Sequence, residues 1–453
     1  MVSSRQCCGL LFALKATFAG LAAIAGLSYQ AYLVYTLYGP DLRLAPVIIP
    51  PPGTADASLC FHDVASGKAR LEPPPGTFWF GFSLDWSVDV PDQLNKRIGK
   101  APVIFNSFVN INATGFQSDI IIWNAQQAGQ VGAMLELTLM PTAPIDTIPT
   151  TILWSYATLM RQINSQYGVP VLLRFGHEMN GPWMTNHGMR PRAYVQAFAT
   201  LSSYVRANTN MTAMLWSPNI GNSYPFGAVP GQDPTPAVGT AEFAALDTNK
   251  DGQLTILDDP YGPYYPGDEW VDWVGVSVYN YLYDNNHQIA PIAVDVLTTP
   301  GEVSLTGADA MHNFYQRFPG TSHKPFILSE TGSAYQTGGG QVVPAGDQTQ
   351  FEMVSKRSWW NAILHTAVGA GAAMPKLFAA VWFEEQKREP DSNLANVDTW
   401  RDFRITFNTT VRNQFVTDVN ALGTQLDWAG SLSVKCNAFI LLFLCISGLV
   451  SWC

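Results

Sequence analysis

The sequence has 453 residues, of which 47% are hydrophobic and 13% are charged. It therefore carries about half of the usual share of charged residues, and it is too apolar for a disordered chain. Lys and Arg total 25 against 35 Asp and Glu, which gives a net charge of -10. This charge excludes a general attraction for nucleic acid or for anionic lipid headgroups. The 14 Trp and 17 Tyr residues supply flat rings that suit sugar binding, although they suit core packing equally well.

Residues 1–39 have the pattern of a signal peptide or a signal-anchor. Arg5 and Lys15 precede an uncharged run from Ala16 to Gly39, which is long enough to cross a bilayer as a helix. A shorter interpretation ends at a cleavage site of small residues around Ala23 and Ala25. Both interpretations export the rest of the chain into the secretory pathway. Three glycosylation sequons agree with export, and they begin at Asn112, Asn210 and Asn408.

Residues 429–453 resemble a lipid-anchor signal or a membrane tail. Small residues at 429–431 are followed by a short spacer and by the uncharged segment Ala438–Cys453. The alternative is a final buried helix. We expect an extracellular or cell-surface protein that is attached to the membrane through one or both termini, and a chain that is a glycoprotein.

Residues 40–76 form a Pro-rich linker, and residues 77–425 alternate between strand and helix patterns. Amphipathic helices are expected at Thr151–Tyr167, Pro191–Asn208 and Phe351–Gly369. The expected strands are Phe78–Leu84, Pro102–Val109, Ala133–Leu139, Val169–Phe175, Met211–Ser217, Trp273–Tyr279, Pro325–Ser329 and Leu377–Trp382. This alternation predicts an α/β fold, a (β/α)8 TIM barrel. A doubly wound open sheet is the alternative, but no Gly-rich phosphate loop follows the first strand.

Two glutamates follow the fourth and the seventh predicted strands, where a barrel places its chemistry. Glu178 follows the fourth strand and Glu330 follows the seventh, so their side chains can meet over the barrel mouth. Facing carboxylates suit the cleavage of a glycosidic bond, because one protonates the leaving oxygen while the other attacks the sugar or activates water. Arg174 and His177 are placed to hold the nucleophile ionised and correctly oriented. A glutamate that only solvates a loop is the alternative for each residue taken alone.

The run from Arg174 through His177, Glu178, Asn180 and Gly181 to Trp183 resembles the signature of glycoside hydrolase family 26, the retaining β-mannanases and their relatives. The resemblance covers roughly residues 77–425. It implies that Glu178 is the acid/base and that Glu330 is the nucleophile. It further implies a set of substrate-binding residues around them: Arg174, His177, Asn180, Trp183, Trp216, Tyr279 and Trp382.

Within that set the resemblance gives specific roles to three residues. Tyr279 is expected to hydrogen-bond the nucleophile, and Trp183 and Trp382 to form the floor and wall of the sugar subsites. Trp216 is expected to line the cleft, with ordinary core packing as its alternative.

Residues 247–258 match the spacing of a calcium loop of the EF-hand type, inserted in the barrel. The expected ligands are Asp247, Asn249, Asp251, Gln253 through its backbone carbonyl, and Asp258 in place of the usual Glu. A single loop favours a structural ion over a sensor, and an acidic surface turn is the alternative. No cofactor is expected for the chemistry itself, since the seven His show no paired ligand spacing.

The sequence therefore predicts a retaining endo-glycoside hydrolase that acts on a β-linked polysaccharide, with β-1,4-mannan as the leading substrate. A β-1,3-1,4-glucanase, a β-1,3-xylanase or a wall-remodelling transglycosylase would use the same glutamates. A barrel that binds carbohydrate without catalysis is the alternative from another functional class.

Overall fold

The computed structural model describes residues 69–73, 76–221, 224–226, 235–280, 314–337, 348–368, 372–390 and 398–429. The predicted signal segment and the predicted C-terminal tail lie outside these residues, except for Ala429, and so does most of the Pro-rich linker. Within the described ranges, no helix is long and apolar enough to cross a membrane.

Eight parallel strands close into a barrel. In sheet order they run β1, β10, β8, β7, β6, β5, β4 and β2, and β2 pairs again with β1. Their bounds are β1 Phe78–Leu84, β2 Ile104–Asn112, β4 Met134–Pro141, β5 Val171–Phe175, β6 Thr212–Trp216, β7 Trp273–Asn280, β8 Phe326–Ser333 and β10 Leu377–Glu384. The predicted (β/α)8 barrel is therefore confirmed.

Each predicted strand coincides with one of these eight. The strands could be recognised because they read as nearly continuous apolar runs, which is typical of parallel strands buried on both faces. The largest difference is in the seventh strand, which continues through Ser333 instead of ending at Ser329. Glu330 consequently lies within β8 and not in the loop that follows it.

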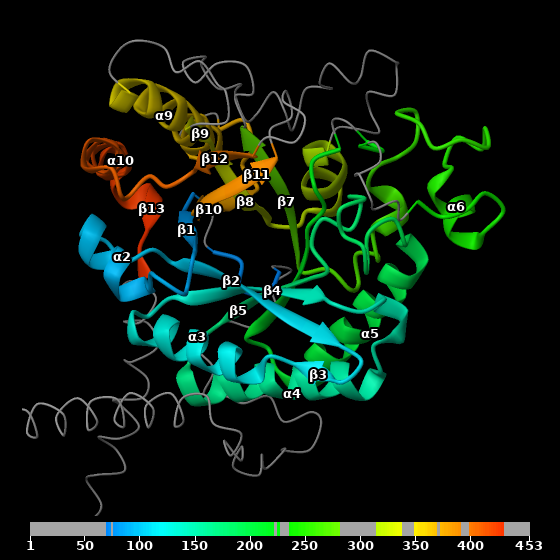
Figure 1. Ribbon diagram of the computed structural model, residues 1–453. Helices are drawn as coiled ribbons and strands as arrows, with labels where there is room; N and C mark the ends of the chain where they lie inside the picture. The colour runs from blue at the N-terminus through cyan, green and yellow to red at the C-terminus, as the bar shows by residue number, and fades with distance from the viewer. Residues whose placement is uncertain are drawn as a thin grey trace, which may run out of the picture. The chain divides into compact units, whose positions relative to one another are not determined.

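Helices cover the outside of the barrel, and Figure 1 shows α3, α4 and α5 along the outer side of β2, β4 and β5. The helix α4 ends at Gly168, whose φ of +64° is the left-handed conformation that glycine adopts readily. The bounds are α2 Pro91–Ile98, α3 Ser118–Gln130, α4 Thr150–Tyr167, α5 Pro191–Asn208, α6 Ala241–Leu246, α9 Gln348–Ala367 and α10 Thr409–Ala421.

A small antiparallel sheet extends from the barrel mouth. It contains β11 Gln386–Pro390, which continues from β10, together with β12 Asp398–Asp402 and β9 Tyr335–Thr337, which follows β8. Figure 1 shows these strands near the labelled ends of β8 and β10. Two short strands, β3 Gly115–Phe116 and β13 Leu426–Asp427, add to the main sheet at β2 and β1.

The barrel interior changes from apolar to polar along the strands. Near the strand starts, the inward side chains pack as a dry cluster that includes Trp79, Ile104, Met134 and Leu172. Two to four residues further along the strands, the inward positions carry polar and charged groups, and these are Asn106, Glu136, Thr138, Arg174 and Ser277. The apolar layer supplies the stable core, and the polar layer supports the catalytic end of the barrel.

Candidate active site

The backbone around Glu178 is held in an unusual conformation. After β5 the chain passes through Gly176 and Glu178 with φ angles of +56° and +52°. A non-glycine residue in this region costs roughly 1–3 kcal/mol and persists only where the surroundings fix it. Here the N–H of Glu178 donates to the carbonyl of Ser217, at the end of β6, over 3.0 Å. The strain and this anchor together fix the glutamate at the mouth of the barrel.

The Glu178 carboxylate is nearly buried, with 8% of the residue exposed. The indole N–H of Trp183 donates to its Oε2 over 2.6 Å, and the Asn219 amide donates to its Oε1 over 3.0 Å. Burial raises the pKa of Glu178, and the negative charge of Glu330 raises it further, against the lowering effects of Arg174 and the two hydrogen bonds. A raised pKa keeps the proton that a general acid must donate.

The Glu330 carboxylate is bound by two different donors. Arg174 donates to its Oε1 in a buried ion pair, and the Tyr279 hydroxyl donates to its Oε2 over 2.8 Å. The residue is 7% exposed, so a bound sugar can still reach it. A positive charge and two hydrogen bonds stabilise the ionised carboxylate, which is the form that a nucleophile requires.

Arg174 organises the polar layer beneath Glu330. It is fully buried on β5, and its Nη2 donates to the Ser277 hydroxyl on β7 over 2.6 Å. Burial by itself would lower the pKa of Arg174, but the charge of Glu330 and the hydrogen bond to it raise that pKa above its ordinary value. The guanidinium is therefore a fixed positive charge directly behind the nucleophile.

The two carboxylates consequently occupy unequal environments. Glu178 is placed among neutral donors and has a raised pKa, whereas Glu330 is paired with a guanidinium. Two carboxyl groups whose surroundings separate their protonation states are suited to an acid and a nucleophile acting on one glycosidic bond.

His177 lies beside this pair as a neutral ring. Burial lowers its pKa well below the ordinary value, and the positive charge of Arg174 and the nearby His187 lower it further. Its ring meets the edge of Phe108 at 5.4 Å between centroids, and its backbone carbonyl contacts His187 Nε2 over 2.8 Å. Among the described residues, the hydrogen bonds of His177 do not include one to Glu330, and its role beside the reaction centre stays a prediction.

Four of the residues expected to bind substrate are fully buried. Arg174 contacts Glu330, and the Asn180 amide exchanges hydrogen bonds with the backbone of Asn219. The indole N–H of Trp216 donates to the Tyr264 carbonyl, and that of Trp382 donates to the Phe403 carbonyl. Trp183 and Tyr279 remain partly exposed beside the glutamates. The substrate-binding roles of all these residues stay predictions.

The structure adds three residues to the site that the sequence analysis left out. They are Asn219, which holds Glu178, and Ser277 and Glu136, which contact or face Arg174. Asn219 follows a strand end, which is the same signal that identified Glu178. Ser277 and Glu136 interrupt apolar strands at inward positions, and that interruption is a signal for a polar barrel interior.

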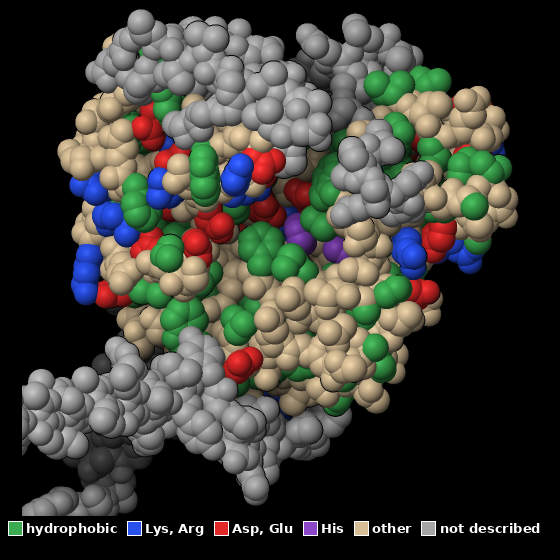
Figure 2. Space-filling model, in the orientation of Figure 1, with side chains coloured by type: hydrophobic (Ala, Val, Ile, Leu, Met, Phe, Trp, Pro, Cys, Tyr) green, Lys and Arg blue, Asp and Glu red, His purple; other side chains and the backbone are tan. Residues whose placement is uncertain are grey.

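Acidic side chains lie near Glu330. Glu385 follows β10, and burial together with the charge of Asp85 raises its pKa to about 7, with Lys387 acting in the opposite direction and Glu330 adding to the rise. Figure 2 shows acidic side chains above and to the left of the histidines near the middle of the visible face, with hydrophobic side chains beside them. Carboxylate oxygens in this position can accept hydrogen bonds.

The predicted calcium loop folds around its own backbone amides. The carboxylate of Asp247 accepts hydrogen bonds from the N–H groups of Asp251 and Gly252. Asp258 is fully buried and accepts from the N–H groups of Thr248, Asn249 and Thr255. Asn249 donates to Asp251, and Gln253 is exposed. In the described part of the chain, no group of three or more His, Cys, Asp or Glu is arranged to hold a metal. The calcium site stays a prediction.

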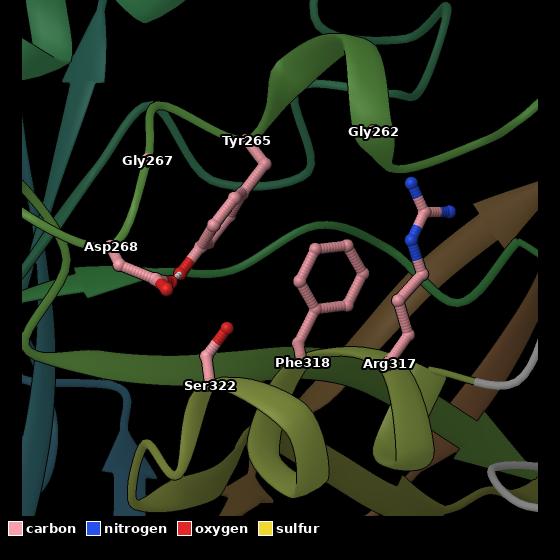
Figure 3. Close-up of a pocket in the computed structure, with 7 residues that line it drawn as sticks. All are labelled: Gly262, Tyr265, Gly267, Asp268, Arg317, Phe318 and Ser322. Atoms are coloured by element: carbon pink, nitrogen blue, oxygen red, sulfur yellow. Dashed lines mark hydrogen bonds between the residues drawn. The ribbon is translucent and has the colours of Figure 1, made fainter.

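A pocket of about 400 Å³ is lined by residues that include neither glutamate (Figure 3). The Tyr265 hydroxyl donates to Asp268 over 2.6 Å, and Arg317 at the other end of the pocket pairs with Asp259. Phe318, between them, is almost fully buried. The polar side chains Tyr265 and Arg317 are thus paired with protein partners, and the Phe318 ring is covered. We therefore do not assign catalysis to this pocket.

The environment of Glu178 yields a prediction about pH dependence. Asn219 lowers the pKa of Glu178 through its hydrogen bond, so Asn219→Ala is expected to raise that pKa. The alkaline limb of the kcat profile should move to higher pH, while kcat falls by up to about 100-fold from the loss of positioning. Measuring kcat against pH for both proteins checks this, and an alkaline limb that stays in place or moves to lower pH would contradict it.

Comparison with known proteins agrees with this geometry. Residues 148–319, which contain Glu178 and its partner Asn219, match the model of glycosyl hydrolase family 26. No curated protein matches the sequence.

Among solved structures, the chain is similar to the catalytic domain of an endo-β-1,4-mannanase of family 26 from Bacillus sp. JAMB-750, with 14% identity over 80% of this chain and 89% of that chain and a TM-score of 0.44. It is also similar to a modular endo-β-1,4-mannanase from Cellulomonas fimi, with 14% identity over 79% and 73% of the two chains and a TM-score of 0.44. A family 26 β-mannanase from Bacteroides ovatus shows 12% identity over 78% and 91%, with a TM-score of 0.42.

These structural likenesses are distant and show no more than a similar fold. The match over residues 148–319 includes Glu178 and ends before Glu330. It agrees with the resemblance of the sequence to glycoside hydrolase family 26.

Proposed function

We propose that the protein is a retaining endo-β-mannanase in which Glu178 is the acid/base and Glu330 is the nucleophile. In the first step Glu330 forms a bond to the anomeric carbon while the glycosidic bond breaks, and Glu178 gives its proton to the leaving oxygen. In the second step Glu178 takes a proton from water, which attacks the anomeric carbon and releases Glu330.

The unequal environments of the two glutamates are the observation that carries this proposal. Glu330 forms an ion pair with Arg174 and accepts a hydrogen bond from Tyr279, whereas Glu178 accepts from neutral donors and has a raised pKa. Retention and β-1,4-mannan as the substrate rest on the resemblance to family 26. The similar structures from Bacillus and Cellulomonas fimi are both endo-β-1,4-mannanases, which agrees with β-1,4-mannan as the proposed substrate.

The experiment is product release from soluble β-1,4-mannan, mixed-linkage β-glucan and β-1,3-xylan, with the Glu178→Ala and Glu330→Ala variants beside the wild type. Cleavage of mannan that is lost in both variants supports the proposal. Cleavage of one of the other polymers instead would change the proposed substrate but would keep Glu178 and Glu330 as the proposed catalytic residues. Longer chains formed from oligosaccharides would indicate a transglycosylase, and binding without any product would indicate a carbohydrate-binding barrel.

We further propose that the enzyme acts outside the cell and is tethered to the membrane through one or both termini. The support is the uncharged run from Ala16 to Gly39, the apolar segment Ala438–Cys453 and the sequons. The Asn408 amide donates to Glu352 over 2.8 Å, whereas the Asn112 amide donates to the Thr142 hydroxyl over 3.5 Å in an exposed contact, so glycosylation is more compatible with Asn112. Treatment of cells with a phospholipase that cleaves lipid anchors would distinguish the two forms of attachment, because it should release a lipid-anchored protein but not one held by a membrane helix.

We also propose that the loop at residues 247–258 binds a structural calcium ion, on the basis of its ligand spacing. Calcium should raise the melting temperature, since a ligand at 100 times its Kd stabilises the folded state by about 2.7 kcal/mol. Asp247→Asn is the matched control, because the amide oxygen can still accept a hydrogen bond but contributes no charge. A melting curve that is the same with calcium and with chelator would contradict the site.

A further inference from the structure

Glu136 is a buried glutamate that the proposed mechanism does not use. It lies on β4 at an inward position, opposite Asn106 on β2 and Leu172 on β5, and it is fully buried. Neither of its carboxylate oxygens has a hydrogen-bond partner, and the Arg174 Nε, 3.9 Å from Oε1, has none either. An ionised carboxylate without hydrogen-bond donors is costly to bury, so this geometry favours a carboxyl group that keeps its proton.

The charges around Glu136 support the same conclusion. Burial raises the pKa of Glu136 to about 8, and the negative charge of Glu330 on β8 adds to this, while Arg174 on β5 and the Asn106 amide on β2 act in the opposite direction. Arg174 already directs Nη1 to Glu330 and Nη2 to Ser277. Both Nη atoms of Arg174 are therefore bound to Glu330 and Ser277, and only Nε faces Glu136, at 3.9 Å.

We propose that Glu136 is a positioning residue that stays protonated in the working enzyme and thereby leaves the Arg174 charge to the nucleophile. The inference rests on Glu330 being that nucleophile. If Glu136 lost its proton, a second negative charge would compete for the same guanidinium and weaken its hold on Glu330. Glu136 therefore limits the pH range over which the nucleophile is correctly held.

The first test uses stability and needs no activity. The folded-state pKa of Glu136, about 8, lies above its ordinary value of 4.5. Its contribution to stability is therefore fully present below pH 4.5 and is lost as the pH rises toward 8. Glu136→Gln keeps the shape of the protonated side chain but does not titrate. The melting temperature of Glu136→Gln should rise relative to that of the wild type between pH 4.5 and 8. A difference between the two melting temperatures that does not change over this pH range would overturn the proposal.

Glu384→Gln is the matched control. Glu384 is a buried glutamate on β10, but its oxygens accept hydrogen bonds from the N–H groups of Ile405 and Thr406 and from the Thr406 hydroxyl. In Glu384→Gln, the amide N–H groups would face these donors without an acceptor, so the variant should have a lower melting temperature than the wild type. The same substitution at two buried glutamates is thus expected to have opposite effects, because only one of them is surrounded by donors.

The second test uses an aryl oligosaccharide with an activated leaving group, whose departure needs no proton from Glu178. With this substrate, kcat/KM of the wild type should fall above about pH 8 as Glu136 ionises, and Glu136→Gln should keep its activity there. Near pH 6, Glu136→Gln should stay within about threefold of the wild type, while Glu136→Ala falls further because it leaves a cavity beside Arg174.

Two results would overturn the proposal in this second test. One is an equal alkaline loss in the wild type and in Glu136→Gln, and the other is a Glu136→Gln variant as impaired as Glu136→Ala near pH 6. A wild type that cleaves no glycoside would contradict the proposed function instead. The melting comparison would still decide the protonation of Glu136.

Discussion

Replacing Glu330 with Ala is expected to reduce turnover by about 10⁴-fold or more, because the group that forms the covalent intermediate is removed. The same change leaves the buried Arg174 without its ion-pair partner, and breaking such a pair costs up to about 3–5 kcal/mol of stability. Steady-state kinetics and thermal unfolding measure the two effects. Residual activity near the wild-type level would show that Glu330 is not the nucleophile.

Azide provides a control for an inactive Glu330→Ala variant that is still folded. The truncated side chain leaves space for azide to attack an activated aryl glycoside, and the product should be a glycosyl azide with the anomeric configuration opposite to that of the substrate. Because the misfolded variant would give no product, this rescue distinguishes a missing nucleophile from a lost fold.

Replacing Glu178 with Ala is expected to have an effect that depends on the leaving group. On polysaccharide, whose leaving oxygen needs a proton, kcat/KM should fall by about 10²–10⁴-fold, the usual contribution of general acid catalysis. On an aryl glycoside with an activated leaving group, kcat/KM should fall much less. The raised pKa of Glu178, caused by burial and by Glu330, also predicts that the alkaline limb of the wild-type profile on polysaccharide disappears in this variant.

The control for Glu178 is Trp183→Phe, which removes the indole N–H that donates to Oε2 and part of the ring, but leaves the carboxyl group in place. This variant should keep general acid catalysis and therefore the same dependence on the leaving group as the wild type. An equal loss on both substrates in Glu178→Ala would contradict its role as the acid and would indicate a residue that holds the substrate.

The barrel could be predicted from the sequence because its signals are local. The strand runs, such as Val171–Phe175 in β5, are apolar and bounded by turns, and the helices between them are amphipathic. The end of β8 was placed too early because Glu330 and Thr331 are polar, yet inward polar residues inside a strand are what the upper barrel contains. Polarity marks the end of a strand only where the strand faces an apolar core.

The two glutamates could be found because an apolar run turns polar at each of them, although Glu178 follows its strand and Glu330 lies inside β8. The roles of the residues around them depend on how deeply the fold buries each side chain. Trp382 and Trp183 look alike in sequence, and both are close to a strand end. In the fold Trp382 packs against Trp360 at 6.3 Å between ring centroids and is fully buried, whereas Trp183 is partly exposed and bonds Glu178. Which face of a strand a residue takes, and what covers it, is set by tertiary packing across segments that are far apart in the sequence.

The central claim is that Glu330 forms a covalent bond to the sugar, and trapping that intermediate tests it most directly. The wild type would be incubated with a mannosyl oligosaccharide that carries fluorine at C2 of the reacting sugar and an activated leaving group, then digested and examined by mass spectrometry. We expect one labelled peptide with the sugar on Glu330, and protection by excess unlabelled oligosaccharide. A label on another residue, or hydrolysis that proceeds with inversion and leaves no label, would contradict the mechanism.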